Sequence, residues 1–315
     1  VLINIIDFFF SCKKQEDNVL SQEITDWEFK YNGYWHKAKI PGSNFYDLLH
    51  HDFIKDPFYG TNEDSIQLIS EKNWHYKSNF SVTKNTLRKQ NKILIFNGLD
   101  TYAKVYLNDS LVLKADNMFR TWHINASNIL KKENTLYIKF NANSKIEKQK
   151  QKSLGYSLPG GKRVFTRKAG FHYGWDWGPK ITPVGICRKV ELKSWDTCKI
   201  KSLYIEQDNL SDSIASLTVN IQIESSTAKK ITIKVHDSFL EDFELKKGGN
   251  HLSFNIQILS PELWWPNGYG NQKLYDISVC IADKNGILDS RIKKIGLRKI
   301  ELITKQDSLG KTFYF

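Results

Sequence analysis

The chain has 315 residues, 40% of them hydrophobic, and this composition excludes an intrinsically disordered protein. Its length predicts two domains, each able to bury a core of its own. The net charge of +12 comes from scattered lysines rather than from an arginine-rich stripe or an aromatic platform, so a nucleic-acid partner is not expected.

Residues 1–15 differ in character from the rest of the chain. They begin with an apolar run, VLINIIDFFF, that is too short to span a bilayer and has the length of a signal-peptide core. Ser11 and Cys12, followed by two lysines, resemble a bacterial lipoprotein cleavage site at which Cys12 becomes lipidated. This interpretation predicts an exported protein, periplasmic or at the cell surface, with a lipid anchor on a bacterial membrane. The alternative is a hydrophobic first strand that packs into a sandwich.

Residues 16–195 alternate between apolar and polar side chains, which is the pattern of half-buried strands. Asn108-Asp109 is a hairpin turn signal between two of these strands. Short antiparallel strands joined by turns predict a jelly-roll-like β-sandwich over 16–195. Helix is expected only at Tyr46–His51 and Ser144–Leu154, where the lysine-rich stretch is interpreted as a solvated helical turn. The clearest strands are at 74–82, 93–95, 103–107, 136–140 and 190–192.

The alternation restarts after Trp195. So many strands in about 100 residues predict an immunoglobulin-like sandwich over 196–298, without the Cys…Trp…Cys framework of true immunoglobulin domains. The fold class expected for the chain is therefore all-β, a jelly-roll (galactose-binding-like) sandwich followed by an immunoglobulin-like sandwich. The strands of the second sandwich are expected at 217–223, 231–235, 252–256 and 275–281.

The four cysteines lie at positions 12, 187, 198 and 280, with no C-x-x-C spacing, and the histidines include one adjacent pair, His50-His51. A zinc site is therefore not expected, and no other metal or cofactor is predicted. A disulfide between Cys187 and Cys198 remains open, but free, half-buried thiols are the expectation.

The most informative segment is 171–179, FHYGWDWGP, in which Asp176 lies between Trp175 and Trp177. An indole face suits the C–H face of a pyranose ring, and a carboxylate accepts hydrogen bonds from sugar hydroxyls. About a third of residues 155–185 are glycine or proline, which excludes a regular strand or helix. Long ordered loops that carry aromatics and charge are usually functional, so we predict a carbohydrate site. The alternative is a core tryptophan pair with a capping aspartate.

The sequence contains no complete catalytic site. Nucleophile elbows of the G-x-S-x-G type, P-loops and dinucleotide fingerprints are absent. Asn62-Glu63-Asp64 is the one tempting carboxylate pair, and a capping role in a polar turn is expected for it.

Several motifs occur in one order along the chain. They are Asp56–Gly60 with Asn62-Glu63, Gly98–Ala103, Val105–Asn108, Asn117–Arg120, Arg167-Lys168, His172–Pro179, Leu263–Gly270, Leu274-Tyr275 and Ile295–Arg298. Together they resemble the β-mannosidases of glycoside hydrolase family two. The Trp-Asp-Trp-Gly-Pro segment separates β-mannosidases from their relatives, whereas Trp-Trp-Pro-Asn-Gly marks the wider family.

The resemblance implies an exo-acting, retaining enzyme that removes terminal β-mannose from mannoside oligosaccharides. In that family the two sandwiches precede a (β/α)₈ barrel, which takes roughly 250 residues and holds both catalytic glutamates. Residues 299–315 are then the start of that barrel, so no catalytic residue is expected here and the fragment alone is predicted to be inactive. The expected partners are the β-mannoside oligosaccharide and the catalytic barrel of the same polypeptide.

The resemblance also implies roles for residues of the loop. Asp176 binds hydroxyls of the terminal mannose, and Trp177 closes the sugar pocket beside it. Trp175 is either a further substrate contact or a packing residue. Arg167 and His172 are expected to support the loop.

Outside the loop, Trp264 and Trp265 are expected to pack a domain junction, and Arg298 to form a structural ion pair. Cys187 departs from the family, which usually has tryptophan at this point. Two alternatives stay open. One is a stand-alone carbohydrate-binding module without hydrolase activity, and the other is the same family acting on a β-glucosaminide or β-galactoside.

Overall fold

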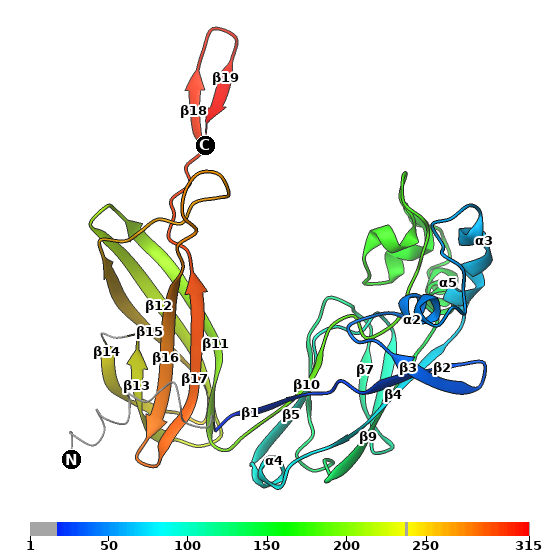
Figure 1. The fold of residues 1–315 in the computed structure, drawn as a ribbon, viewed down its shortest axis with the longest axis horizontal. Helices are drawn as coiled ribbons and strands as arrows, with labels where there is room; N and C mark the ends of the chain where they lie inside the picture. Colours follow the sequence, from blue (N-terminus) through cyan, green and yellow to red (C-terminus); the bar gives the residue numbers. More distant parts are fainter. Residues whose placement is uncertain (1–17, 237–238, 315) are drawn as a thin grey trace. The chain divides into compact units, whose positions relative to one another are not determined.

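The computed structural model describes residues 18–236 and 239–314, so Cys12 and the rest of the predicted 1–15 segment lie outside the described residues. The described chain is built mainly of antiparallel β-strands (Figure 1), which confirms the all-β class. It divides into two compact units, one at Leu20–Trp195 and the other made of Asn18, Val19 and the described residues from Asp196 onward. None of the described helices is long and apolar enough to cross a membrane.

The first unit is a sandwich of two antiparallel sheets, the jelly-roll architecture that the alternation predicts. The larger sheet has the strand order β3-β2-β4-β9-β6-β7, and the smaller sheet has the order β1-β10-β5-β8. The strands are β1 (Leu20–Glu23), β2 (Trp27–Tyr31), β3 (Tyr34–Ala38), β4 (Trp74–Ser81), β5 (Asn91–Phe96), β6 (Ala103–Leu107), β7 (Ser110–Ala115), β8 (Trp122–Asn125), β9 (Glu133–Phe140) and β10 (Val190–Trp195).

The core of this unit follows from the period of two. In β9, Leu136, Ile138 and Phe140 are fully buried, while the residues between them are more exposed. Tyr76 of β4 packs against Phe140, with ring centroids 5.7 Å apart and an interplanar angle of 86°. Burying each of these side chains contributes roughly 2 kcal/mol, and a slip of one residue would turn them all to solvent. The hydrophobic pattern therefore fixes the strand register.

The predicted hairpin joins β6 to β7. Asn108 and Asp109 both have positive φ, 48° and 66°, as the central residues of a type I′ turn do. Asn108 also fixes the turn to its neighbours, because its amide donates to Asn134 Oδ1 at 3.0 Å and its Oδ1 accepts from Thr135 N at 3.0 Å. The prediction of a turn at this point is confirmed.

Both predicted helices are present, as α2 (Asn44–His50) and α5 (Asn143–Leu154). The lysines of α5 are exposed, as expected of a solvated turn, but another side of the helix buries Asn143 and Glu147. Further short helical segments escape sequence analysis, because four or five residues show no helical period. They are α3 (Asn62–Ile66), α4 (Lys84–Arg88) and the 3₁₀ segments η1 (Gln67–Glu71), η2 (Gly161–Phe165) and η3 (Gly170–Tyr173).

The second unit is the immunoglobulin-like sandwich. Its sheets have the orders β11-β12-β15 and β14-β13-β16-β17, and the hairpin β18-β19 follows them. β12 alternates between half-buried and buried residues, with Leu217, Val219 and Ile221 in the core. The strands are β11 (Cys198–Leu210), β12 (Ile214–Ser225), β13 (Lys229–Val235), β14 (Phe239–Leu245), β15 (Gly248–Leu259), β16 (Tyr275–Asp283), β17 (Gly286–Ile295), β18 (Ile303–Gln306) and β19 (Lys311–Tyr314).

The cysteines of the described chain are free thiols. Cys187 is half-buried, and Cys198 and Cys280 are buried. The disulfide between Cys187 and Cys198 that the sequence leaves open does not form.

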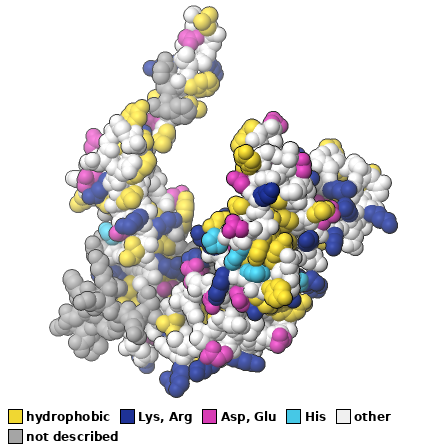
Figure 2. Space-filling view, turned by 45° about the vertical axis from the view of Figure 1, so that its right-hand side comes forward, with side chains coloured by type: hydrophobic (Ala, Val, Ile, Leu, Met, Phe, Trp, Pro, Cys, Tyr) yellow, Lys and Arg dark blue, Asp and Glu magenta, His cyan; other side chains and the backbone are white. Residues whose placement is uncertain are grey.

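The charged surface is mixed in sign. Figure 2 shows lysine and arginine side chains interspersed with acidic ones on the face that it draws. Some of these charges pair at the surface, as Lys294 does with Asp276 at 2.7 Å. Exposed pairs of this kind contribute little to stability, so the lysine-rich surface has little influence on which fold forms.

Candidate functional site

The Trp-Asp-Trp loop, residues 174–179, ends in a tight turn. Trp175 and Gly178 exchange two backbone hydrogen bonds, each 3.3 Å long, so Asp176 and Trp177 are the two residues at the tip. Trp177 is 87% exposed and Trp175 is 58% exposed. The Asp176 carboxylate is exposed too, and within the described part of the chain it has no hydrogen bond or ion pair. This placement excludes a core tryptophan pair with a capping aspartate.

The tip offers groups that suit a hydrogen-bonding ligand with an apolar face. Indole surface exposed to water is costly unless a partner covers it, and the Asp176 carboxylate has its full capacity to accept hydrogen bonds. The loop begins with a sharp change of backbone direction at Gly174, whose φ of +97° is one that glycine adopts easily. A Cβ at this position would also lie 3.4 Å from the Cβ of Lys180. Over 18–236 and 239–314, no group of three or more His, Cys, Asp and Glu is placed to hold a metal ion.

A buried ion pair lies at the base of the loop. Lys168 Nζ pairs with Asp100 Oδ2 and also donates to the carbonyl of Pro183 at 2.7 Å. The Thr101 hydroxyl donates to Asp100 Oδ1, and the Asp100 backbone exchanges two 2.9 Å hydrogen bonds with Gly185. The side chains of Lys168 and Asp100 are 0% and 4% exposed, and burial lowers the pKa of Lys168 while Asp100 opposes that shift. The pair therefore joins the chain before the loop to the chain after it.

His172 stands beside this ion pair in its neutral form. Burial first, and then the positive charge of Lys168, lower the pKa of His172 to about 4. Its Nδ1 lies 3.8 Å from Asp100 Oδ2 and has no hydrogen-bond partner among the residues that the structure describes. Because the imidazole is uncharged at neutral pH, this approach is not an ion pair. The His172 carbonyl accepts from the Thr182 hydroxyl at 3.0 Å, which ties the two sides of the loop together.

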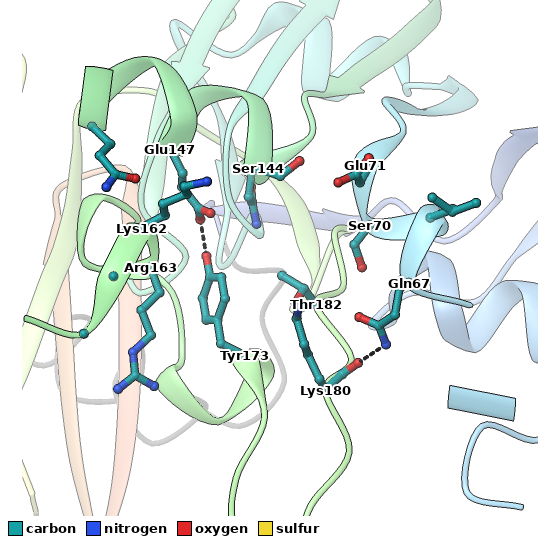
Figure 3. Close-up of a pocket in the computed structure, with 15 residues that line it drawn as sticks. Gln67, Ser70, Glu71, Ser144, Glu147, Lys162, Arg163, Tyr173, Lys180 and Thr182 are labelled. Carbon is teal, nitrogen blue, oxygen red and sulfur yellow. Dashed lines mark hydrogen bonds between the residues drawn. The ribbon is translucent and has the colours of Figure 1, made fainter. Parts of the chain in front are cut away.

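A second anchor comes from α5. Glu147 is 4% exposed, and its Oε1 accepts from the hydroxyl of Thr166 at 2.7 Å and from the hydroxyl of Tyr173 (Figure 3). Burial and the bond to Glu147 raise the pKa of Tyr173, so its phenol remains a donor. One helix carboxylate thus holds two points of the segment that leads into the loop.

The returning side of the loop is held through its backbone. Lys180 N donates to Glu63 Oε1 at 2.7 Å, and the Lys180 carbonyl accepts from Gln67 Nε2 at 2.9 Å (Figure 3). Further along, Val184 N donates to Asn44 Oδ1 and Asn44 N donates to Val184 O, both at 2.9 Å. The expectation that Glu63 caps a polar turn is wrong, because Glu63 belongs to α3 and binds the loop.

Arg167 contributes to the loop through its backbone. Its carbonyl accepts from Met118 N at 3.0 Å, and Ala169 N donates to Met118 Sδ at 3.1 Å. The Arg167 side chain is exposed, and its guanidinium has no partner in the described part of the chain.

Cys187 packs closely at the base. A Cβ on Gly98 would lie 2.7 Å from Cys187 Sγ, so the thiol fills the space beside that glycine. Burial raises the pKa of the Cys187 thiol, which keeps it protonated. The half-buried thiol, which is smaller than the tryptophan that the family resemblance implies at this point, therefore packs against Gly98.

The second tryptophan pair belongs to the other unit. Trp264 N donates to Leu297 O at 2.9 Å, and the Arg298 guanidinium lies over the Trp265 ring, 5.0 Å from its centroid. Arg298 makes no ion pair with any described residue, so the expected structural ion pair is wrong and a cation–π contact takes its place. The role of the two tryptophans at a domain junction stays a prediction.

Comparison with known proteins covers nearly the whole chain. Residues 16–188 match the family model described as "Glycosyl hydrolase 2 galactose-binding domain-like", and residues 198–298 match the model described as "Glycosyl hydrolases family 2". The chain belongs to glycosyl hydrolase family 2. This confirms the resemblance that its motifs carry.

Relatives in this family include named β-mannosidases. β-Mannosidase B of Emericella nidulans is 33% identical over 310 residues, which cover 92% of this chain and 36% of that protein. The β-D-mannosidase from Dictyoglomus thermophilum superposes with a TM-score of 0.84 at 32% identity, over 94% of this chain and 38% of that one. An exo-chitosanase of Amycolatopsis orientalis, at 18% identity and a TM-score of 0.73, shares the fold alone, over 93% of this chain and 36% of that one. The chain spans about a third of the length of the curated relatives that it matches.

These relatives correct the expected location. Curated β-mannosidases that match the chain come from fungi, Emericella nidulans and Aspergillus clavatus among them, and these are not bacterial lipoproteins. The prediction of an exported lipoprotein on a bacterial membrane is therefore wrong. The lipidation of Cys12 on which it rested lies outside the described residues.

The residues at the tip of the loop stand out in the sequence of this family 2 chain, whereas most residues of its base do not. Asp100 and Lys168 both belong to motifs of the family resemblance, but nothing local shows that they pair across 68 positions. Glu147 is a lone acid within a lysine-rich helix, and that contrast was the available signal for a buried carboxylate. Glu63 gave no signal beyond its place in a family motif.

Proposed function

We propose that the chain is the N-terminal portion of an exo-acting, retaining β-mannosidase, in which Asp176 accepts hydrogen bonds from hydroxyls of the terminal mannose. The observation that carries this proposal is the unpaired Asp176 carboxylate at the tip of a firmly anchored loop, flanked by two exposed indoles. The names of relatives at 33% and 32% identity support a mannoside as the substrate.

The chemistry itself is proposed to take place on another part of the same polypeptide. In a retaining glycosidase one carboxylate attacks the anomeric carbon while a second protonates the leaving oxygen and then activates water. Both glutamates are proposed to lie on a (β/α)₈ barrel, with residues 299–315 as its start. The jelly roll over 16–195 and the immunoglobulin-like sandwich over 196–298 are the domains that precede it.

In this proposal the loop acts by positioning the sugar. Asp176 orients the terminal ring through its hydroxyls, and Trp177 covers the C–H face of the ring. Trp175, at the start of the turn, lines the same pocket. Arg167 and His172 support the loop from below. Because none of these residues transfers a proton or attacks carbon, their contribution is to hold a reactive geometry that the barrel completes.

The proposal is tested by comparing two proteins. An enzyme that joins this chain to its barrel should hydrolyse an aryl β-mannoside, and the chain of 315 residues by itself should not. Aryl β-galactoside and aryl β-glucosaminide, assayed in parallel, test the sugar. Turnover by the short chain, or a preference of the joined enzyme for another sugar, would contradict the proposal.

The exposed tip also supports a second function, a stand-alone carbohydrate-binding module. Asp176 has no partner in the described part of the chain, so its carboxylate oxygens can accept hydrogen bonds from a ligand without a contribution from a barrel. Calorimetry of the chain with mannose and mannobiose tests this function, and binding that Asp176→Ala abolishes would support it. The reading frame downstream of Phe315 separates the two functions, because a continuing frame with a barrel favours the enzyme and a stop codon favours the module.

A further inference from the structure

A pocket of about 550 Å³ lies beside the stem of the Trp-Asp-Trp loop, wholly within the first unit. Figure 3 shows side chains from α5, η1, η2 and the loop stem around one space. The loop stem contributes Tyr173 on its outgoing side and Lys180 with Thr182 on its returning side. The pocket therefore shares a wall with the loop without including its tip.

Three polar residues of α5 line this pocket at helical spacing. Asn143, Glu147 and Gln151 are each four positions apart, so they lie on one face of the helix, about 6 Å from one to the next. Asn143 and Glu147 are 2% and 4% exposed. A helix face that packs against protein is normally apolar, so this polar stripe is not explained by the core.

Some hydrogen-bonding groups of the stripe are unsatisfied. Both amide atoms of Asn143, and Oε1 of Gln151, are buried without a hydrogen-bond partner among the described residues. Folded proteins pair the large majority of their buried polar side-chain atoms, so unpaired ones that line a pocket are available to a ligand. Glu147 differs, because its Oε1 is already engaged by Thr166 and Tyr173. The free groups are thus one donor and two acceptors, all on residues that line the pocket.

A neutral polyol matches these groups better than an ion does. A sugar hydroxyl both donates and accepts, as the Asn143 amide does. An anion would meet the carboxylates of Glu147 and Glu71, and a cation would meet Lys162 and Arg163 at the same pocket. The volume of about 550 Å³ lies within the range of small-ligand sites.

We propose that this pocket binds one hexose unit of a neutral saccharide, with Asn143 and Gln151 as its hydrogen-bonding residues, separately from Asp176 at the loop tip. The inference does not rest on the proposed hydrolase function, because every residue of the pocket belongs to the first unit.

Titration of the chain with methyl β-mannoside, followed by NMR, tests the inference. The dissociation constant should be on the order of 1 mM, as expected of a few hydrogen bonds in an open site. Asn143→Ala and Gln151→Ala should each weaken binding about tenfold, because each removes a group that only the ligand satisfies. Asp116→Ala, which removes an exposed carboxylate of the first unit away from both the pocket and the loop tip, is the control and should leave this binding unchanged. Glucuronate, which is similar in size but anionic, should bind about tenfold more weakly than the neutral sugar.

Several results would overturn the inference. One is the absence of binding at methyl β-mannoside concentrations far above the expected dissociation constant. Another is binding that Asp176→Ala abolishes and Asn143→Ala leaves intact, since the sugar would then sit at the tip. If Asn143→Ala does not fold, Gln151→Ala decides alone, and an unchanged affinity there rejects the site. The proposed hydrolase fails by a different observation, the lack of aryl β-mannoside turnover by the joined enzyme.

Discussion

The tip and the base of the Trp-Asp-Trp loop treat charge in opposite ways. At the tip, Asp176 is exposed and unpaired within the described chain, between indoles that are 58% and 87% exposed. At the base, Asp100 and Lys168 are buried as an ion pair, and Glu147 accepts hydrogen bonds from two hydroxyl groups. The same chemical group, a carboxylate, holds the loop in place at one end and is left available at the other.

This contrast explains how a loop can be fixed in place and still be free to bind a ligand. A group that acts by position must be held within a fraction of an ångström, and buried charge-assisted hydrogen bonds supply that restraint. An exposed carboxylate adds little to the fold and keeps its capacity for a ligand. We therefore expect substitutions at the base to change stability and substitutions at the tip to change binding.

Removing the cation of the base should cause the largest loss. In Lys168→Met, Asp100 stays buried without its cation, and breaking a buried pair from one side costs about 3–5 kcal/mol of unfolding free energy. Lys189→Met is the matched control, because Lys189 pairs with Glu191 at 2.9 Å but is 51% exposed. Such an exposed pair contributes about 1 kcal/mol or less. Urea unfolding measures both variants, and equal losses would show that the buried pair has no special role.

The counterpart at the tip is Asp176→Ala. In the enzyme joined to its barrel, losing the hydrogen bonds of this carboxylate should lower kcat/KM about 100-fold, or about 3 kcal/mol, with stability unchanged. Asp116→Ala, which removes another exposed and unpaired carboxylate of the first unit, is the control and should leave kcat/KM unchanged. An unchanged kcat/KM in Asp176→Ala would mean that the tip does not touch the sugar.

The sandwiches and the tip were predictable from sequence because their signals are local. Alternation in β9 and the Asn108-Asp109 turn depend on neighbouring residues, and so does the Trp-Asp-Trp triplet itself. A period of two survives over any strand long enough to show it. These features are therefore visible in a single sequence.

The base was not predictable, because its contacts join residues far apart in the chain. Lys168 meets Asp100 across 68 positions, and Glu63 meets the Lys180 backbone across 117. No periodicity encodes such pairs. The prediction for Arg298 fails for a related reason. Trp265 lies far from Arg298 in the sequence, which does not reveal whether an arginine will pair with an acid or stack on a distant ring.

Acidification should weaken the base through His172. Its pKa is about 4 in the folded protein against an ordinary 6.5, so between these pH values the unfolded chain binds a proton that the folded chain does not. The unfolding free energy therefore falls as pH decreases through this window, by about 2 kcal/mol between pH 7 and pH 5. Urea unfolding at the two pH values measures it.

A variant is needed to isolate this effect, because Asp47 acts in the opposite direction. Burial raises the pKa of Asp47 to about 6, so the folded chain gains stability there as pH falls. His172→Asn removes only the contribution of the histidine. We expect its stability to fall less than that of the wild type between pH 7 and pH 5, and parallel pH profiles would show that His172 does not titrate as the geometry implies.

The smallest effect is expected at Arg167, on the border between tip and base. Its carbonyl holds Met118 N at 3.0 Å, whereas its side chain is exposed and unpaired within the described chain. Arg167→Ala keeps the carbonyl, so the unfolding free energy should change by less than about 0.5 kcal/mol. The value of kcat/KM in the joined enzyme should also stay within about twofold if the residue supports the loop through its backbone alone. A tenfold loss of kcat/KM at unchanged stability would instead indicate that the Arg167 guanidinium contacts the sugar.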